Sequence, residues 1–551
     1  MKKQIITALS CCMLSLGLMA QEEMQTEWTQ KYDHKTQWVG TGLEGPDKVS
    51  FIATEKKITV FKTSDGSIVW NGAYKNIVPK FRKVDAFAPF WESGAIFLFD
   101  KKLGKDKLAV VDLKTGKVLW DSEVYQGLTV DNIEYIPEKD GFILSLENSL
   151  TFVDARTGEE KWESTAFNGA VAMWQYIEGD LVMLNFAPPG LRAFFRGFKN
   201  QLARIDLDNG DIKWTTTYSG VPERKIVTKE RIYDMNIKGG KVFLTMKGLQ
   251  VFDVKSGATL WSAAFDEEVK KRIIQVNSPF GKGGKGGKIY GAIADPLIVG
   301  RDVYIVQKTR KSKKFAIYKY DINTGKVLWS SEQFKAAEAI PNIFVINDKL
   351  IAQVGGVVEV QSITKSTVDG VTTTTYSVGT KNIKPNGLIA FNTSDGSQVW
   401  DSEKFKKGIT NAFVDGENLI VSSGKALYSI RFSDGKVNYE EDVKNGGVGL
   451  AVEILKYKEN IVVIGQKGVS LFTISEGKMV KASKYKKASF QSLEDNILLM
   501  RTAKNDFAAF NLDDCTYVKY NAKKDSQQAL STDGKFVWAY EKKQVTKLKT
   551  R

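Results

Sequence analysis

The sequence is almost without histidine and contains little cysteine. His34 is the one histidine among 551 residues. This excludes or cripples mechanisms that need a histidine base beside a nucleophile, and metal sites built from several histidines. Two of the three cysteines, Cys11 and Cys12, lie in the apolar N-terminal segment, and the third is Cys515. A chain that loses this segment on export keeps one thiol, so its stability must come from burial and strand pairing and not from internal disulfides.

Long apolar runs are missing after the N-terminal segment. In that segment two lysines precede an apolar stretch that ends at Ala20, which predicts a secretory signal peptide over residues 1–20. The residues before Cys11 match a lipid-attachment motif poorly, so simple cleavage is favoured over lipid anchoring. No later stretch reaches the roughly 18 to 20 apolar residues of a membrane-spanning helix. We therefore expect residues 21–551 to be exported to the periplasm or the cell surface.

Acidic residues are outnumbered by basic ones, and the formal net charge is +15. The cations are scattered over turns and loops and form no single stripe. Nucleic acid is therefore not an expected partner of an exported chain, whereas the positive charge favours acidic partners.

A glycine four residues before a tryptophan recurs along the chain. The clear pairs are Gly66/Trp70, Gly116/Trp120, Gly158/Trp162, Gly210/Trp214, Gly257/Trp261, Gly325/Trp329 and Gly396/Trp400. Seven of the twelve tryptophans thus obey one rule. Their spacing fits a repeat of about 40 to 50 residues in which some loops are enlarged. Weaker copies follow at Gly435, Gly477 and Asp513.

Each repeat consists of short strand-like segments joined by turns. Residues 241–246 and 249–254 are two such segments, and long stretches with helical periodicity are hard to find. Before the glycine, an aspartate or asparagine can accept hydrogen bonds from the amides just ahead, and the glycine supplies the positive φ of a tight turn. The tryptophan can bury its ring between neighbouring sheets while its indole N–H reaches a carbonyl. Sheets of about four strands at this period predict an all-β fold, a β-propeller.

The repeats also resemble a known family. VVDLKTGKVLW, FVDARTGEEKW, RIDLDNGDIKW and KYDINTGKVLW closely resemble the tryptophan-docking motif of the PQQ-type, or quinoprotein alcohol dehydrogenase-like, propeller superfamily. The resemblance covers nearly all of residues 21–551 and implies four-stranded blades docked by the seven repeat tryptophans. Family propellers usually have eight blades. Seven clear units, three weaker ones and a final half unit favour either an enlarged ring or two propellers that meet near residues 350–390.

The C-terminal half unit, FVWAYEKKQVTKLKT, is short of a strand. The segment TEWTQKYD around Trp28 can supply it from the other end of the chain. Such closure leaves no sheet edge free to pair with another chain. We expect a ring closed in this way and a monomeric protein.

The resemblance raises an enzymatic alternative. Some members oxidise alcohols or sugars with PQQ and calcium, and the family's alcohol dehydrogenases carry adjacent cysteines, an aspartate base and carboxylate or amide calcium ligands. Here the adjacent cysteines lie in the predicted leader. The repeat aspartates are fully explained as turn residues; they are Asp112, Asp154, Asp206, Asp253 and Asp321. The sequence thus nominates no catalytic, cofactor-binding or metal-binding residue.

Three insertions interrupt the repeats. The first, residues 188–199, holds the candidate interaction residues Arg192, Phe194, Phe195, Arg196, Phe198 and Lys199. Aromatic and arginine side chains are typical of binding hot spots, so this loop predicts contact with a partner or a membrane surface. The alternative is that the phenylalanines fold under and cap the core.

The other two insertions differ in character. Residues 281–288 read GKGGKGGK, but no Ser or Thr follows the last lysine and no helix follows, so the segment is not a phosphate loop. We expect a mobile basic loop. Residues 355–387 alternate in a threonine-rich pattern that predicts an extended hairpin. That hairpin is either a plain elaboration or an arm that embraces a partner.

Together these features favour an exported, non-enzymatic propeller that acts as a protein-interaction platform in the cell envelope without a cofactor. Resemblance to non-enzymatic members, such as the propeller of the outer-membrane assembly machinery, implies the same. The first alternative is a dehydrogenase of alcohols or sugars that uses PQQ and calcium, or a relic of one that holds a small ligand in the central channel. A third is recognition of carbohydrate or another anionic surface component.

Overall fold

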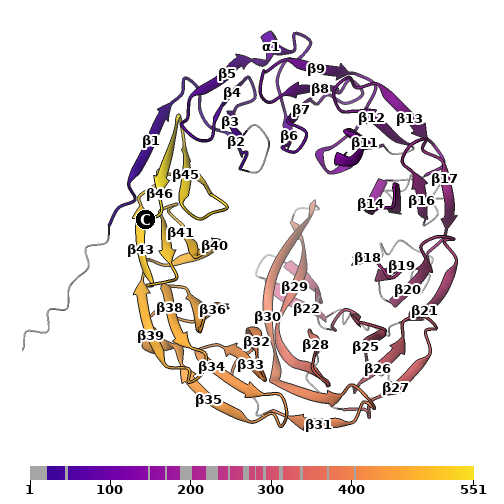
Figure 1. Cartoon of the computed structure of the whole chain (residues 1–551), viewed down its shortest axis with the longest axis vertical. Helices are drawn as coiled ribbons and strands as arrows, with labels where there is room; N and C mark the ends of the chain where they lie inside the picture. Colours follow the sequence, from indigo (N-terminus) through magenta and orange to yellow (C-terminus); the bar gives the residue numbers. More distant parts are fainter. Residues whose placement is uncertain are drawn as a thin grey trace, which may run out of the picture.

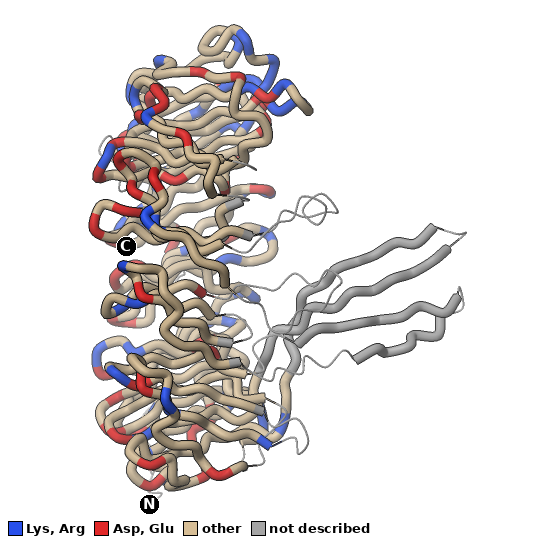
Figure 2. Tube along the Cα trace, turned by 90° about the vertical axis from the view of Figure 1, so that its right-hand side faces the viewer, with Lys and Arg blue, Asp and Glu red and all other residues tan. Residues whose placement is uncertain are grey.

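Eleven β-sheets follow one another around a ring in the computed structural model of the protein (Figure 1). The structure describes residues 22–43, 48–146, 149–167, 170–186, 201–218, 234–245, 248–264, 272–278, 281–289, 293–308, 314–334, 339–368, 371–402 and 405–551. Over these residues ten sheets have four strands and one has six. Seen edge-on, the sheets form a single layer of blades (Figure 2). The prediction of a β-propeller is confirmed, and of the two arrangements the chain adopts the enlarged ring.

Blades 1 to 6 each contain four antiparallel strands in sequence order, counted from the innermost strand outward. Their strands are β2 (Trp38–Thr41), β3 (Val49–Ala53), β4 (Lys57–Lys62) and β5 (Ile68–Ala73); β6 (Ala86–Phe90), β7 (Ala95–Asp100), β8 (Lys107–Asp112) and β9 (Val118–Ser122); β10 (Ile133–Ile136), β11 (Gly141–Ser145), β12 (Leu150–Asp154) and β13 (Glu160–Ser164); β14 (Ala170–Ile177), β15 (Asp180–Phe186), β16 (Leu202–Asp206) and β17 (Ile212–Thr216); β18 (Asp234–Lys238), β19 (Lys241–Thr245), β20 (Gly248–Asp253) and β21 (Thr259–Ala264); β24 (Leu297–Val299), β25 (Asp302–Lys308), β26 (Phe315–Asp321) and β27 (Val327–Ser330).

Blades 7 to 11 continue the same order, and blade 7 carries two additional strands, β22 (Arg272–Ser278) and β23 (Gly281–Ile289). The strands of these blades are β28 (Ile343–Ile346), β29 (Lys349–Val368), β30 (Val371–Asn392) and β31 (Gln398–Asp401); β32 (Ile409–Asp415), β33 (Asn418–Ser423), β34 (Ala426–Arg431) and β35 (Val437–Asp442); β36 (Ala451–Tyr457), β37 (Asn460–Gly465), β38 (Gly468–Thr473) and β39 (Met479–Lys484); β40 (Ala488–Glu494), β41 (Ile497–Thr502), β42 (Phe507–Asn511) and β43 (Thr516–Tyr520); β44 (Gln527–Leu530), β45 (Phe536–Glu541), β46 (Gln544–Lys549) and β1 (Thr26–Lys31). Helical structure in the described residues is confined to α1 (Tyr74–Ile77) and to 3₁₀ turns at Val130–Asn132, Pro137–Lys139 and Val443–Gly446.

The last blade is completed by the start of the chain. β1 pairs antiparallel with β46, so that Trp28 lies opposite Lys547. The predicted closure is confirmed. An apolar cluster seals the junction between blades 11 and 1, and it includes Ile52 and Phe61 from blade 1 and Trp538 and Tyr540 from blade 11.

The core lies between blades, not inside a single sheet. The middle strands are apolar on both faces because each face is covered by a neighbouring blade; all of β7, AIFLFD, is buried. An apolar cluster of buried side chains occupies each junction, as between blades 2 and 3 around Phe97 and Phe142. The outermost strands are more exposed, as in β5. One blade alone would leave both apolar faces in water, so the blades stabilise one another.

Each repeat tryptophan bridges its own blade to the next. The indole N–H donates to a backbone carbonyl in the turn that precedes the outermost strand of the following blade. The Nε1–O pairs are Trp70–Leu113 (2.8 Å), Trp120–Ala155 (3.2 Å), Trp162–Leu207 (2.8 Å), Trp214–Val254 (3.0 Å), Trp261–Ile322 (3.0 Å), Trp329–Thr393 (2.9 Å) and Trp400–Phe432 (2.7 Å).

The repeat glycine faces the ring of the preceding blade's tryptophan. Gly158 has φ +68, and a Cβ built on it would lie 2.5 Å from the ring of Trp120. Gly116 stands in the same way against Trp70, at 2.6 Å. Glycine is therefore required twice, for the positive φ and for the close approach of the indole. The sequence revealed only the first reason.

Trp28 belongs to the same set, although the sequence pattern did not show it. Its indole donates to the carbonyl of Ser64 at 2.7 Å, and its ring lies against Gly66. Two later junctions use other donors. The Tyr439 hydroxyl donates to the Ile474 carbonyl at 2.9 Å, and the Ser483 hydroxyl donates to the Cys515 carbonyl.

The second and third insertions join into one extension of blade 7. β29 has 20 residues and β30 has 22, and they pair from Lys349/Asn392 to Val368/Val371. The prediction of an extended hairpin is confirmed. The segment GKGGKGGK is not a loop as expected but strand β23, paired with β22 on one side and β29 on the other. The loop prediction was wrong because main-chain hydrogen bonds to a long neighbouring strand need no side-chain pattern in the glycine-rich segment.

We predict that Gly158→Ala destabilises the ring by more than its backbone conformation alone would cost. Gly104 is a matched control, since its φ is also +68 but nothing lies within 4 Å of its added Cβ. Gly104→Ala should cost about 1–2 kcal/mol for the left-handed conformation. Gly158→Ala should lose about 1–3 kcal/mol more, because the methyl group displaces Trp120. Urea unfolding followed by tryptophan fluorescence measures both; equal midpoints would refute the docking role of Gly158.

Candidate functional face of the ring

The connections between strands lie on two different faces. Because the strands of a blade alternate in direction, the second-to-third connection and the link to the next blade emerge at the same end. Hydrogen bonds confirm this proximity, for example from Val443 N to Lys425 O and from Tyr485 N to Lys467 O, at 2.8 Å each. We call this side the insertion face. The opposite side, which carries the repeat turns, is the turn face.

All three insertions attach to the insertion face. Residues 188–199 join β15 to β16, the second and third strands of blade 4. β22 and β23 lie in the link from blade 5 to blade 6, and the β29–β30 hairpin joins the second and third strands of blade 7. Sequence alone could not place them on one side, because that requires the strand order.

The arm, defined as β22, β23 and the parts of β29 and β30 beyond Gly356, is a continuous four-stranded sheet. At about 3.3 Å per residue, the paired strands from Val357 to Val368 span roughly 40 Å. Strands of the other blades have at most 8 residues. The arm is thus the largest departure from the repeat.

The candidate interaction residues Arg192, Phe194, Phe195, Arg196, Phe198 and Lys199 lie outside the described residues. The seven docking tryptophans are structural and lie at blade junctions, where Trp120, Trp162, Trp214, Trp261 and Trp400 are buried. A bulge in the ladder follows the strand position opposite each repeat tryptophan, as between Val110 and Val111 in blade 2. Such a bulge redirects side chains locally.

The repeat aspartates hold the turns. Asp154 Oδ1 accepts from the amides of Arg156 and Thr157, both at 2.9 Å, and Asp321 Oδ1 accepts from Asn323 N at 3.0 Å and Thr324 N at 2.8 Å. Asp112, Asp206 and Asp253 accept amide hydrogen bonds in the same way. These bonds contribute to a lowered pKa of the Asp154 and Asp321 carboxyl groups, and the carboxylates are occupied by the turn.

The described residues contain no group of three or more His, Cys, Asp or Glu side chains arranged to hold a metal ion. Cys515 is buried and donates to the Val469 carbonyl at 3.4 Å, and burial raises the pKa of its thiol to about 11. Within the same residues no helix has the length and apolar content to cross a membrane.

A small pocket lies between blades 3 and 4. It has a volume of about 60 Å³, and Asp131, Glu134 and Trp174 are among its lining residues. Leu181 and Met183 are apolar residues of the lining. The lining also includes Ser145, whose hydroxyl oxygen accepts a hydrogen bond from the Val171 amide at 3.3 Å.

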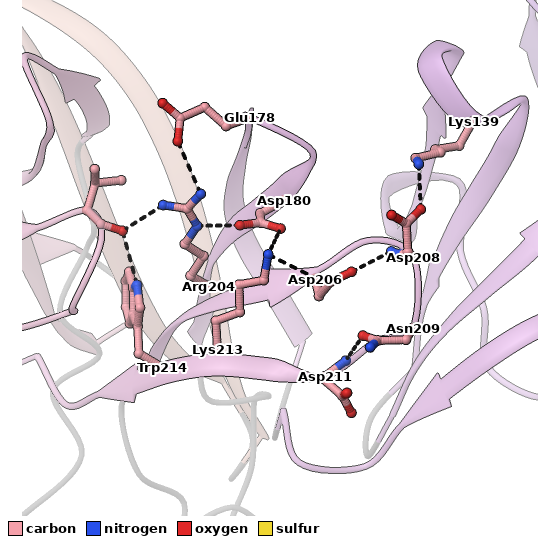
Figure 3. A network of polar contacts seen from close by, with 11 residues as sticks. Lys139, Glu178, Asp180, Arg204, Asp206, Asp208, Asn209, Asp211, Lys213 and Trp214 are labelled. Carbon is pink, nitrogen blue, oxygen red and sulfur yellow. Dashed lines mark hydrogen bonds and ion pairs between the residues drawn. The ribbon is translucent and has the colours of Figure 1, made fainter.

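A charged network occupies the junction of blades 4 and 5 (Figure 3). Arg204 is buried and donates through Nε to Asp180 Oδ2 at 2.5 Å and through a terminal nitrogen to the Val254 carbonyl at 3.2 Å. Lys213 contacts Asp180 at 2.7 Å and Asp206 at 3.0 Å. Pairing with Asp180 raises the pKa of Lys213, and the hydrogen bond from Lys213 lowers the pKa of Asp206. All these charges compensate one another, so the network is structural.

In three blades the residue opposite the docking tryptophan is a cation that donates to the same carbonyl as the indole. Arg204 lies opposite Trp214 in the ladder, and both donate to the Val254 carbonyl. Lys319, opposite Trp329, donates to the Thr393 carbonyl at 3.0 Å. Lys547, opposite Trp28, donates to the Ser64 carbonyl at 3.1 Å. Other blades have an uncharged residue at this position, such as Val110 opposite Trp120. At these three junctions a cation therefore supplements the indole on one acceptor.

The four-stranded blades, the docked tryptophans and their glycine turns define a PQQ-type β-propeller. The family model described as outer membrane protein assembly factor BamB matches residues 19–261 and 234–362, more than half of the chain. The chain belongs to this family.

Solved structures with similarity include BamB from Moraxella catarrhalis, which is 15% identical over 77% of this chain and 96% of that chain, with a TM-score of 0.33. The computationally designed Ika8 protein is 11% identical over 71% of this chain and 95% of its own, with a TM-score of 0.32. A eukaryotic initiation factor is 9% identical over 75% and 94%, with a TM-score of 0.37. Similarities at this level carry no information on activity or partners. No curated protein matches the chain.

We predict that Asp180→Asn destabilises the protein by about 3–5 kcal/mol, because it leaves Arg204 buried without its anion. Glu178 is the control: it also contacts Arg204, at 3.4 Å, but its side chain is 67% exposed. Glu178→Gln should cost about 0–1 kcal/mol. Urea denaturation of both variants tests this, and similar losses in the two would contradict the importance of burial.

Proposed function

We propose that the chain is an exported, non-enzymatic propeller that binds a protein partner in the cell envelope through its insertion face. The observation that carries the proposal is the attachment of all three insertions to one face of a ring, whereas the connections on the turn face are short. Variation confined to one face is typical of a binding surface on a rigid scaffold. Membership of a family described as an outer membrane assembly factor supports the envelope location.

The arm and the loop at residues 188–199 are the proposed contact elements. A continuous sheet that extends beyond the ring can contact a partner over a large area while the ring keeps its base fixed. The aromatic and arginine residues of the loop can supply a compact hot spot. The partner would be held by two elements attached to blades 4 and 7 of the same face.

Cross-linking in cells, followed by purification and identification of the captured proteins, tests the proposal. In one variant a short Gly-Ser turn replaces residues 357–382, and in a second a Gly-Ser linker replaces residues 191–199. A control variant, Asp434→Ser with Lys436→Ser, alters the turn face of blade 8. We expect the wild type and the control to capture the same envelope protein and at least one shortened variant to lose it. Undiminished capture of that protein by both shortened variants would refute the proposal.

We further propose that the protein works without PQQ or calcium. The repeat aspartates are engaged by turn amides, and the described residues lack a suitable donor cluster. Mixing the purified protein with PQQ and calcium should leave no cofactor absorbance after gel filtration and no dye-linked oxidation of alcohols or sugars. A quinoprotein dehydrogenase reconstituted in parallel is the positive control. Stoichiometric retention of PQQ together with dye reduction would instead establish the dehydrogenase alternative.

A further inference from the structure

The two most exposed large apolar side chains in the described residues both lie on the insertion face of blade 2. Leu103 is 101% exposed and Val124 is 73% exposed. Their loops are neighbours, since the Asp106 amide donates to Gln126 Oε1 at 2.8 Å. Leu103 therefore has no place in the core, although its loop is held in position.

Exposed lysines flank Leu103 and continue around the ring. Lys102 and Lys105 lie on either side of it. On blades 8 to 11, successive connections of the insertion face carry exposed lysines that we call the lysine crescent: Lys406, Lys425, Lys467, Lys487, Lys504 and Lys543. Lys35 and Lys56 are also exposed, and they extend this series of lysines to blade 1. Blades 8 to 11, 1 and 2 are consecutive in the ring (Figure 1).

The crescent lysines lack carboxylate partners, unlike the cations on the turn face of the same blades. There, Arg431 pairs with Asp434 at 2.7 Å, Lys478 with Glu476 at 2.8 Å and Lys535 with Asp533 at 3.0 Å. Among the described residues, no ion pair joins any of the six crescent lysines to a carboxylate. Other lysines of the same face do have partners: Lys444 pairs with Asp442 at 3.5 Å, Lys486 with Asp506 at 2.9 Å and Lys523 with Glu541 at 3.4 Å. The six crescent lysines therefore add positive charge to the insertion face of blades 8 to 11 beyond that of these pairs.

On the insertion face of blades 8 to 11, the exposed cations among the described residues are lysines. This composition favours an anionic surface over a single bound anion as the partner. Arg501 lies close by but is half-buried, and its guanidinium donates to the Ser526 carbonyl at 2.8 Å. Arginine suits fixed, bidentate recognition, whereas lysine is a mobile, hydrated point charge that can follow many anions at once. A bound acidic segment would cover only part of a crescent that crosses several blades. A layer of lipid headgroups can meet all of it.

We propose that the insertion face of blades 8 to 11, 1 and 2 docks on the surface of a membrane that contains anionic phospholipid. The crescent lysines contact headgroup phosphates, and Leu103 and Val124 enter the boundary between headgroups and acyl chains. Apolar side chains flanked by lysines are the combination that binds such a surface without spanning it. The contact uses neither the arm nor the loop at residues 188–199, so it involves residues other than those of the proposed protein contact on the same face.

Sedimentation of the mature protein with lipid vesicles tests the proposal. Vesicles of phosphatidylcholine with about 30% phosphatidylglycerol should bind the protein, and vesicles of phosphatidylcholine alone should bind it far more weakly. Raising the salt from 0.1 to 0.5 M should weaken binding, since screening shortens the reach of the lysines. Equal binding to both kinds of vesicle, or none to either, would overturn the proposal.

A matched pair of variants separates the crescent from net charge. Lys406, Lys487, Lys504 and Lys543 are changed to Gln in one variant, and Lys62, Lys436, Lys478 and Lys535, exposed on the turn face, are changed to Gln in the other. The crescent variant should partition at least about 50-fold more weakly, as expected for the loss of several surface lysines, while the turn-face variant stays within about threefold of the wild type. Thermal unfolding checks that both are folded. Equal losses would overturn the proposal.

A second variant tests the apolar anchor. Leu103→Ser with Val124→Ser should weaken binding to the anionic vesicles and leave the salt dependence unchanged. The arm-shortened variant should bind vesicles like the wild type, and the crescent variant should still capture the envelope protein in cells. If the crescent variant loses that protein while the wild type ignores vesicles, the surface recognises an acidic protein and the membrane proposal is wrong.

Discussion

The hydrogen bond from an indole N–H to a carbonyl of the next blade's turn is the interaction on which the rest of the ring depends. It fixes one blade against the next at a point where the acceptor is a main-chain atom and the neighbouring residue is a glycine with no side chain to interfere. A sheet such as that of blade 2, buried on both sides, has no stable existence by itself. Repetition of one docking geometry therefore converts a series of weak units into a single closed structure.

Much of this architecture was readable from the sequence, because docking leaves a pair of residues at fixed spacing. Where the glycine and the tryptophan are not four residues apart in the sequence, the repeat cannot be recognised. Trp28 and Gly66 form the same contact as Trp70 and Gly116, but blade 11 takes its last strand from the other end of the chain, so no repeat turn with its glycine precedes Trp28 in the sequence. At later junctions a tyrosine or serine hydroxyl replaces the indole, and the pattern becomes too weak to count blades reliably.

The candidate site was less accessible to sequence reasoning. The unusual residues of the insertions were recognisable, but their common face follows from strand order, which composition does not encode. The cations that share an acceptor with Trp28, Trp214 and Trp329 were likewise hidden, because the pairing across the ladder includes a bulge. The crescent lysines looked like scattered surface charge along the chain, and they gather only when consecutive blades bring alternate connections to one side. The turn face differs because its charges meet partners within the same turn or in the adjacent blade.

The closure of blade 11 also determines when in synthesis the ring can close. β1 is made before every other strand of the ring, yet its partner β46 is made last, and the Thr29 and Thr546 hydroxyls that meet at 3.3 Å are 517 positions apart. Until β46 has been synthesised, β1 has no strand to pair with. A product that ends before β46 therefore keeps an open sheet edge. The ring therefore closes only when both β1 and β46 are present, because each of them covers the free edge of the other.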